Sequence, residues 1–79
     1  MSIMFNESWV PNNAAAITPS NTTVLNCTAI YVGTGGTLVL DMENADNVTF
    51  VNVNAGTVMW IKAVRVKTAT TASNLVALF

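Results

Sequence analysis

The central residues Ala29-Ile-Tyr-Val-Gly-Thr-Gly-Gly-Thr-Leu-Val-Leu-Asp41 have the pattern of two β-strands around a glycine-rich turn. Their two halves, Ala29–Val32 and Thr37–Leu40, are rich in β-branched and aromatic residues, which favour strands. Three glycines separate these halves: Gly33, Gly35 and Gly36. Because glycine readily adopts the positive φ angles of tight turns, this pattern predicts a β-hairpin. Two strands are only marginally stable alone, so other strands must cover them.

Further short strand signals are separated by turn residues along the rest of the chain. They are Ala14–Ile17, Thr22–Leu25, Val48–Val53, Thr57–Ile61, Ala63–Thr68 and Leu75–Phe79. Asp41–Asn47 is interpreted as a polar connection. We predict an all-β fold, a small antiparallel β-sandwich or barrel of about seven short strands with an irregular N-terminal arm. The predicted organisation is an arm over residues 1–13 and a single β domain over residues 14–79.

The composition predicts a domain that gains stability by association. The chain has 79 residues, of which 52% are hydrophobic and only 9% charged. A core of this size supplies roughly 3–5 kcal/mol, and small domains usually add disulfides, a metal or oligomerisation. Cys27 is the single cysteine and histidine is absent, which excludes an internal disulfide and argues against a zinc site. We therefore expect a homo-oligomer.

The charge pattern also argues against several partners. The net charge is −1 with only three basic residues, too little cation for a nucleic-acid surface. Prolines, glycines and polar residues interrupt every apolar run well short of the ~20 residues of a membrane span. No basic segment precedes an apolar stretch at the N-terminus, so we expect no secretory signal and synthesis in the cytoplasm.

No residue pattern in the chain is typical of catalysis. Without histidine, a Ser-His-Asp or Cys-His arrangement cannot be built. Asp41 and Glu43 could form a carboxylate pair, although a solvated acidic turn is the favoured interpretation. The glycine run lacks the Lys-Ser/Thr of a phosphate-binding loop. Cys27 is interpreted as a small buried hydrophobe. We therefore expect a non-enzymatic protein with no catalytic residue, cofactor or metal.

The N-terminal arm contains many large apolar residues without a clear period. One interpretation is that it folds back over its own core, and another is that it docks on a neighbouring subunit or a larger platform. The predicted capsid- or neighbour-anchoring residues are Met4, Phe5 and Trp9. Tryptophan in particular is enriched among the residues that contribute most to interfaces.

The charged residues are segregated along the chain. All three cations, Lys62, Arg65 and Lys67, fall within one short segment, and three acids, Asp41, Glu43 and Asp46, fall within another. One explanation is cross-strand pairing inside a sheet. The other is a head-to-tail contact between subunits, of the kind that builds rings. The predicted intersubunit residues are Asp41, Glu43, Arg65 and Lys67.

Four segments in order resemble a family of small phage-encoded proteins. They are Ala16-Ile-Thr-Pro-Ser-Asn-Thr-Thr23, Ala29-Ile-Tyr-Val-Gly-Thr-Gly-Gly36, Val48-Thr-Phe-Val-Asn-Val-Asn-Ala-Gly-Thr57 and Val64-Arg-Val-Lys-Thr-Ala-Thr-Thr-Ala-Ser-Asn-Leu-Val-Ala-Leu-Phe79. The family is that of the head-spike base, or capsid-decorating, proteins of tailed bacteriophages and gene transfer agents. The resemblance spans about residues 14–79 and departs from the expected pattern at Asn54 and at Met59-Trp60.

The resemblance implies a virion structural protein on the capsid surface, synthesised in the cytoplasm of a bacterial host. Its expected partners are the major capsid protein, further copies of itself in a pentamer or trimer, and a fibre protein; nucleic acid and membrane are not expected. Two alternatives stay open. One is a tail or baseplate component. The other is a glycan- or cell-surface-binding module in which Tyr31, Trp9 or Trp60 stacks on sugar.

Overall fold

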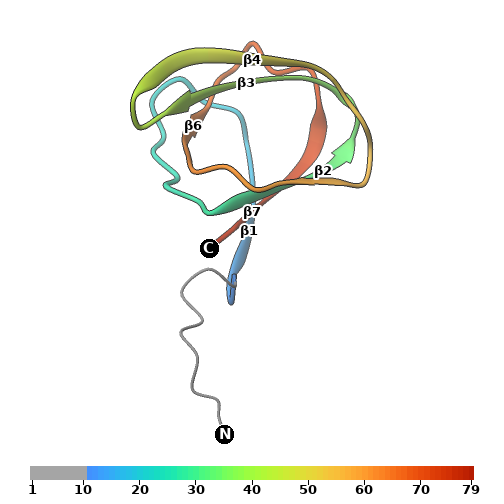
Figure 1. The fold of residues 1–79 in the computed structure, drawn as a ribbon, viewed down its shortest axis with the longest axis horizontal. Coiled ribbons are helices and arrows are strands. Elements are labelled where there is room, and N and C mark those ends of the chain that lie inside the picture. The colour runs from blue at the N-terminus through green and yellow to red at the C-terminus, as the bar shows by residue number, and fades with distance from the viewer. Residues whose placement is uncertain (1–10) are drawn as a thin grey trace, which may run out of the picture.

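The structure, a computed structural model, describes residues 11–79, which form seven β-strands in two antiparallel sheets (Figure 1). The four-stranded sheet has the order β1-β7-β2-β5, with bounds Ala14–Ala16, Ser73–Leu78, Ala29–Thr34 and Thr57–Met59. The three-stranded sheet has the order β4-β3-β6, with bounds Ala45–Val53, Gly36–Met42 and Ala63–Val66. The predicted all-β class is confirmed.

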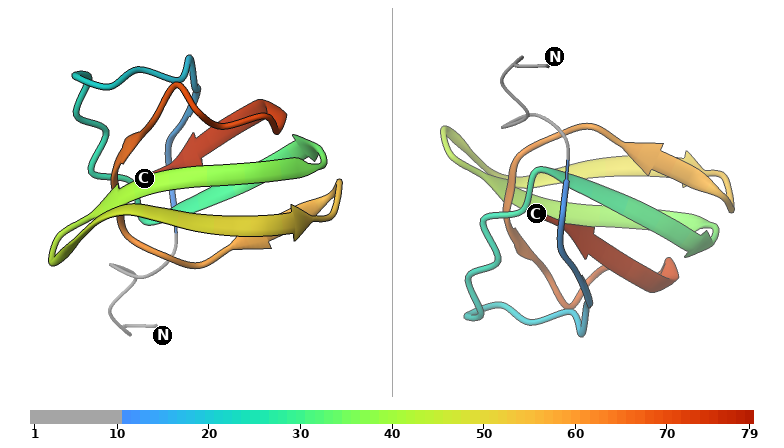
Figure 2. Two further views of the ribbon diagram at one scale, coloured as in Figure 1. Left: turned by 90° about the horizontal axis from the view of Figure 1, so that it is seen from above. Right: turned by 90° about the horizontal axis from the view of Figure 1, so that it is seen from below.

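The two sheets pack face to face around one small core. Figure 2 looks onto each sheet in turn, with β3 and β4 in front in one view and β1, β2 and β7 in front in the other. The largest fully buried side chains come from both sheets: Ile30, Val32, Leu38, Leu40, Val66 and Cys27. These side chains alternate with outward-facing ones along β2, which is the pattern of a sandwich strand.

The strand order is that of a jelly roll that lacks its second strand. The segment over residues 20–27 takes the place of that strand beside β6. The backbone N–H groups of Ser20, Leu25 and Cys27 donate to carbonyl groups of β6 at 2.8, 2.6 and 3.1 Å. The segment therefore covers the edge of β6 without forming a regular strand.

The prediction of a regular strand over Thr22–Leu25 was therefore wrong. Ser20 Oγ accepts hydrogen bonds from the backbone N–H groups of Thr22 and Thr23, both at 3.2 Å. Asn26 takes a left-handed conformation with φ 52°. Short polar side chains that bond to nearby backbone compete with a sheet ladder, which explains the irregular path.

The predicted hairpin over residues 29–41 was also wrong, because β2 and β3 belong to different sheets. Gly35 alone separates the two strands, so the chain crosses from one sheet to the other within one residue. Gly56, with φ 80°, is the only described glycine with a positive φ. The hairpin partner of β3 is β4, joined through the turn at Glu43 and Asn44.

Close backbone approach explains the glycines at the crossing. A Cβ atom on Gly33 would lie 2.6 Å from the carbonyl oxygen of Asn74, and one on Gly35 would lie 2.6 Å from that of Val53. Both distances are far shorter than a van der Waals contact, and both neighbours are backbone atoms that cannot turn aside. The sheet crossing therefore requires residues without a side chain.

We expect Gly35→Ala to lower the free energy of unfolding by about 1–3 kcal/mol, because the new methyl group forces the crossing apart. Urea denaturation followed by circular dichroism measures the change. The matched control is Gly56→Asn, at a positive φ with no neighbour within 4 Å of the position of a Cβ. Asparagine tolerates this conformation, so the control should stay within ~0.5 kcal/mol. Equal midpoints for Gly35→Ala and the unsubstituted protein would contradict the packing explanation.

Candidate interaction surfaces

The outer side of the four-stranded sheet carries a continuous row of apolar side chains. Ala16 pairs with Val76, Val76 with Tyr31, and Tyr31 with Val58. The residues on either side of Tyr31 in β2, Ile30 and Val32, are fully buried in the core. Since side chains alternate along a strand, the Tyr31 row points away from the core.

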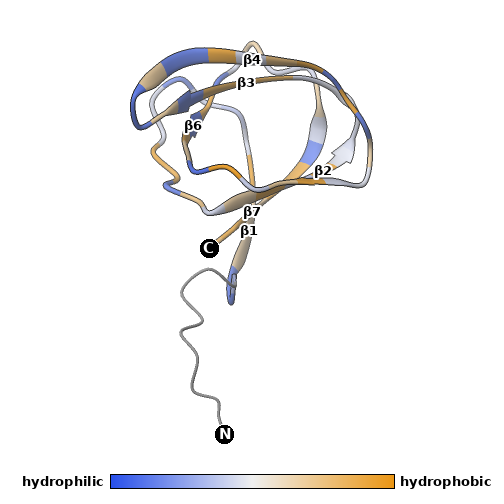
Figure 3. Cartoon of the chain, viewed as in Figure 1, coloured by the Kyte–Doolittle hydropathy of each residue, from blue (hydrophilic) through white to orange (hydrophobic). Residues whose placement is uncertain are grey.

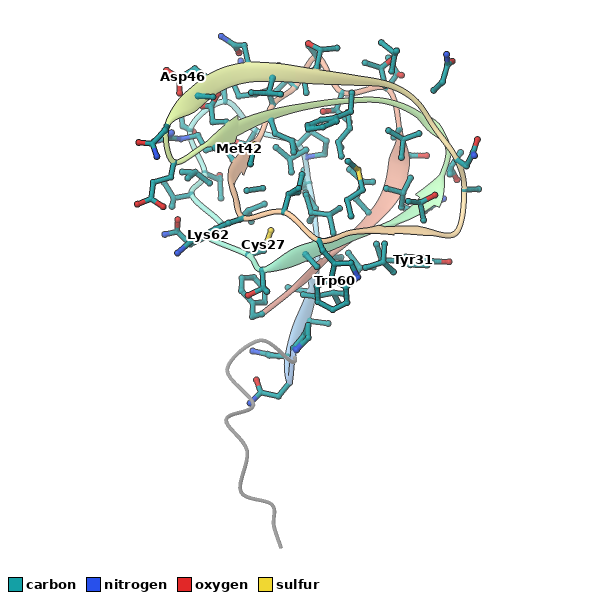
Figure 4. All side chains as sticks on the ribbon, in the orientation of Figure 1. Cys27, Tyr31, Met42, Asp46, Trp60 and Lys62 are labelled. Carbon is teal, nitrogen blue, oxygen red and sulfur yellow. The ribbon has the colours of Figure 1, made fainter. Side chains whose placement is uncertain are left out.

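A second apolar row runs beside the first on the same side. It contains Ala14 of β1 and Leu78 of β7, which pair with each other, while Ala29 of β2, the other partner of Leu78, is fully buried. Trp60 directly follows β5 and is 59% exposed. Figure 4 shows Trp60 and Tyr31 on the side of the β2 sheet that faces away from β3 and β4. We call the two rows the apolar face; its members are Ala14, Ala16, Tyr31, Val58, Trp60, Val76 and Leu78.

The charged residues of the described chain lie elsewhere. The strands β1, β2, β5 and β7 contain none. The charged residues belong to β3, β4, β6 or the segments directly adjoining them, namely Asp41, Glu43, Asp46, Lys62, Arg65 and Lys67. Figure 3 shows strongly hydrophilic segments at the β3–β4 turn and along β6. The two sheets thus differ sharply in the chemistry they offer a partner.

Asp41 is the centre of the charged cluster and is only 4% exposed. It lies on β3 directly opposite Arg65 of β6. Its Oδ2 atom accepts from Lys67 Nζ at 3.2 Å and from Arg65 Nη1 at 3.5 Å. Its Oδ1 atom accepts the backbone N–H of Asn47 at 2.9 Å. One carboxylate therefore ties β3 to both of its neighbouring strands.

The same contacts determine the protonation of Asp41. The Asn47 N–H group holds the pKa of the carboxyl below its ordinary value of 3.8, and Lys67 and Arg65 act in the same direction, while burial opposes them. The group is therefore ionised at neutral pH and fully engaged by donors of its own chain. A carboxylate held in this way stabilises the fold and is poorly placed to act as an acid or base.

A shallow pocket of about 260 Å³ lies at the β3–β4 turn. It is lined by Met42, Glu43, Asn44, Ala45 and Lys62. Figure 4 labels Met42 and Lys62 on this side of the molecule, on the opposite side from Tyr31. The pocket has both apolar and charged walls, so it could receive a side chain of a neighbouring protein.

The other candidate groups of residues 11–79 are a metal cluster, a membrane helix and the single cysteine. Over residues 11–79, no three His, Cys, Asp or Glu side chains gather in a way that could hold a metal ion. No helix in this part of the chain is long and apolar enough to cross a membrane. Cys27 is fully buried, its Sγ atom lies 3.8 Å from the carbonyl oxygen of Ala63, and burial raises the pKa of its thiol. The interpretation of Cys27 as a small buried hydrophobe is confirmed.

The structure brings together three of the four predicted intersubunit residues. Asp41, Arg65 and Lys67 form the cluster described above, which is the cross-strand alternative of the sequence analysis. Glu43 lies apart from them in the exposed β3–β4 turn and lines the pocket with Lys62. The predicted intersubunit contact stays a prediction. The predicted anchors Met4, Phe5 and Trp9 lie outside the described residues.

The apolar face as a whole was not predicted from the sequence. Its aromatic members Tyr31 and Trp60 were considered only as residues that stack on sugar. The available signal was in the strands themselves, because Tyr31 and Val58 hold the outward positions of segments without charge. That signal becomes a surface only when β2, β5 and β7 are known to lie side by side.

We expect Asp41→Asn to lower the stability of the protein at pH 7 and to flatten its loss of stability in acid. Because folding lowers the pKa of Asp41, its contribution is complete above 3.8 and is lost as the pH falls through the lower value of the folded state. Urea midpoints measured at a pH of about 7, 5 and 3 should therefore converge for the two proteins as the pH falls.

The matched control is Asp46→Asn, which removes an exposed carboxylate of β4. It should leave the midpoints close to those of the unsubstituted protein. A constant difference between Asp41→Asn and the unsubstituted protein at every pH would show that the carboxylate charge is not what stabilises the cluster.

Comparison with known proteins identifies one structural relative of interest. No protein-family model matches the sequence, and no curated protein matches it. A chain in a solved structure described as the capsid of a native GTA (gene transfer agent) particle, computed with C5 symmetry, superposes with a TM-score of 0.76. The two sequences are 40% identical, and the alignment covers 87% of this chain and 83% of the other. With the fold and most of both chains shared at this identity, the present chain belongs to the same family as that protein of the GTA capsid.

Proposed function

We propose that the chain is a non-enzymatic structural protein of a virion, and that it decorates the exterior of a capsid as a head-spike base. The observation that carries the proposal is the 40% identity, over 87% of the chain, to a protein in the structure of a GTA capsid. The character of the surface agrees with such a role. An apolar face and a separate charged sheet are features that support binding to other proteins.

The proposed mechanism is passive and depends on repetition. A domain of 79 residues offers only a small contact to any one partner. When a ring of copies binds a symmetric platform, each further contact becomes intramolecular and the total affinity rises steeply. A pentamer would fit a five-fold seat, and a trimer would fit a local three-fold seat. The major capsid protein is the proposed platform, and a fibre protein is a further partner of the assembled base.

Two sets of residues have proposed roles in this assembly. Met4, Phe5 and Trp9 anchor the chain to the capsid or to a neighbouring copy. Glu43, exposed at the β3–β4 turn, is the acid best placed to meet Arg65 or Lys67 of a second copy, because Asp41 is already engaged within its own chain. The side chain of Arg65 is 33% exposed, which leaves part of it open to such a contact.

A second candidate function is supported by the aromatic residues of the apolar face. Tyr31 and Trp60 are 39% and 59% exposed on one side of the sheet, and aromatic rings on a flat surface can stack on sugars. The apolar rows around them favour a protein partner instead, since sugar sites also need polar side chains that bind hydroxyl groups. Binding to a glycan array without binding to capsids would favour this second function, and binding to tail structures would favour a tail or baseplate role.

We expect the purified protein to form a stable oligomer of five or three copies of the 8.4 kDa chain. Association would replace the disulfides and metals that stabilise other small domains. Light scattering during size exclusion, at concentrations that differ by about a hundredfold, measures the mass and its dependence on dilution. A folded monomer at every concentration would contradict a preformed ring. The copies would then assemble only on the capsid itself.

We expect removal of residues 1–10 to leave the fold intact but to abolish attachment to capsids, because the proposed anchors are lost. Co-sedimentation with undecorated capsids measures attachment, and circular dichroism measures the fold. A matched control carries Met4→Leu and Phe5→Leu, which keep the arm apolar and should preserve most of the binding. A truncated protein that still decorates capsids would exclude the arm as the anchor.

A further inference from the structure

The apolar face points to the orientation of the protein on its platform. We infer that the outer side of the four-stranded sheet lies against the capsid shell, and that the charged three-stranded sheet faces away from it. This inference rests on the proposed function and extends it by naming the surface that binds. The occupant of the face is an uncharged, apolar patch of the capsid protein.

The first argument is the cost of removing each surface from water. No strand of the four-stranded sheet contains a charged residue, so its outer face can be buried without desolvating a charged side chain. Burial of the outer side of the opposite sheet would cover Arg65 and Lys67, whose side chains are 33% and 19% exposed beside Asp41. Three charges with one more cation than acid would then lose hydration, at a cost of several kcal/mol per ion unless the partner supplies a further acid.

The second argument is the distribution of exposed apolar side chains. The large hydrophobic residues most exposed to solvent in the described chain are Val24, Tyr31, Val51, Val58 and Trp60. Three of these five belong to the apolar face, whereas Val24 and Val51 lie singly elsewhere. Tyrosine and tryptophan are the residue types that most often contribute strongly to binding. The indole N–H of Trp60 and the hydroxyl of Tyr31 require polar partners, such as backbone carbonyls of the shell.

The third argument is the point at which the N-terminal residues join the domain. The backbone N–H of Asn12 donates to the carbonyl oxygen of Phe79 at 2.8 Å. The backbone N–H of Phe79 donates to the carbonyl oxygen of Asn13, also at 2.8 Å. The chain therefore enters the domain at the β1–β7 edge of the sheet that bears the apolar face (Figure 1). Ten residues precede Pro11, enough to span at most roughly 35 Å when extended. The proposed anchors are thus tethered to the edge of this face, and one partner can contact both.

A second copy of the chain fits the face less well than the shell does. Two copies joined through the same face would form an isologous pair, which closes as a dimer. Such a dimer would hide the apolar faces of both copies and leave mainly charged surface for the platform. A ring instead needs two different surfaces of each copy, which a single self-complementary face does not provide. The test below treats the dimer as an outcome that overturns the inference.

The test uses lysine substitutions in the full chain. Val58→Lys and Trp60→Lys each place a charge on the apolar face. Val51→Lys is the matched control, because Val51 is 66% exposed on β4 of the other sheet. We expect each face variant to bind undecorated capsids about tenfold or more weakly than the unsubstituted protein, with unchanged mass by light scattering and an unchanged urea midpoint. The control should bind normally.

Each contrary result has a distinct meaning. Normal capsid binding by both face variants overturns the inference, as does a selective loss of binding in the Val51 control. A change of oligomer mass in the face variants assigns the face to a copy–copy contact and also overturns it. If the unsubstituted protein fails to bind capsids, the proposed function itself fails.

Oxidative footprinting of the unsubstituted protein provides a readout that depends on no variant. Side-chain oxidation is compared between the soluble protein and the protein bound to capsids. We expect oxidation of both Tyr31 and Trp60 to fall on binding. Equal oxidation of both aromatic residues in the two states would overturn the inference even if the lysine variants failed to fold.

Discussion

The crossing of the chain from β2 to β3 at Gly35 is the constraint on which the rest of the structure depends. With one residue between the two strands, the backbone must leave one sheet and enter the other at once. A Cβ atom on Gly35 would lie only 2.6 Å from the Val53 carbonyl oxygen. This crossing places Ile30 and Val32 of one sheet against Leu38 and Leu40 of the other. Those four side chains belong to one buried cluster, so the tight crossing joins the two halves of the core.

The two edges of the three-stranded sheet, β6 and β4, differ in how they are protected from further strand pairing. The edge of β6 is covered by residues 20–27, whose N–H groups bond to its carbonyls. By contrast, the nine-residue strand β4 forms the other edge of this sheet and is not covered in this way by any described segment. Asn47 and Asn52 within it have left-handed conformations, and its pairing with β3 contains register shifts. Such irregularities twist an edge strand away from a flat pairing surface, which discourages uncontrolled association of copies. A protein proposed to assemble in a defined number benefits from this feature, because continued strand pairing would produce open aggregates.

The separation of charge between the two sheets connects the fold to the proposed function. The buried Asp41 carboxylate fixes β3, β4 and β6 by contacts within its own chain, and its charge is thereby neutralised by Arg65 and Lys67. The four-stranded sheet needs no such device, since none of its strands carries a charged residue. One face is therefore suited to permanent burial against a partner and the other to water, which is the polarity expected of a protein that sits on a surface.

The sequence by itself determined the β class, most of the strands and the segregation of charge, because these depend on residue type and on alternation within a few neighbours. The strand segments expected around residues 14–17, 29–32, 48–53 and 63–68 all coincide with observed strands. Only the tertiary structure decided which strands share a sheet and why positions 33 and 35 require glycine. It also decided that Asp41 and Arg65, 24 residues apart in the sequence, lie in contact. It likewise decided that Ala16, Val76, Tyr31 and Val58 form one surface. Pairing between distant segments is governed by packing of the common core, and no local pattern records it.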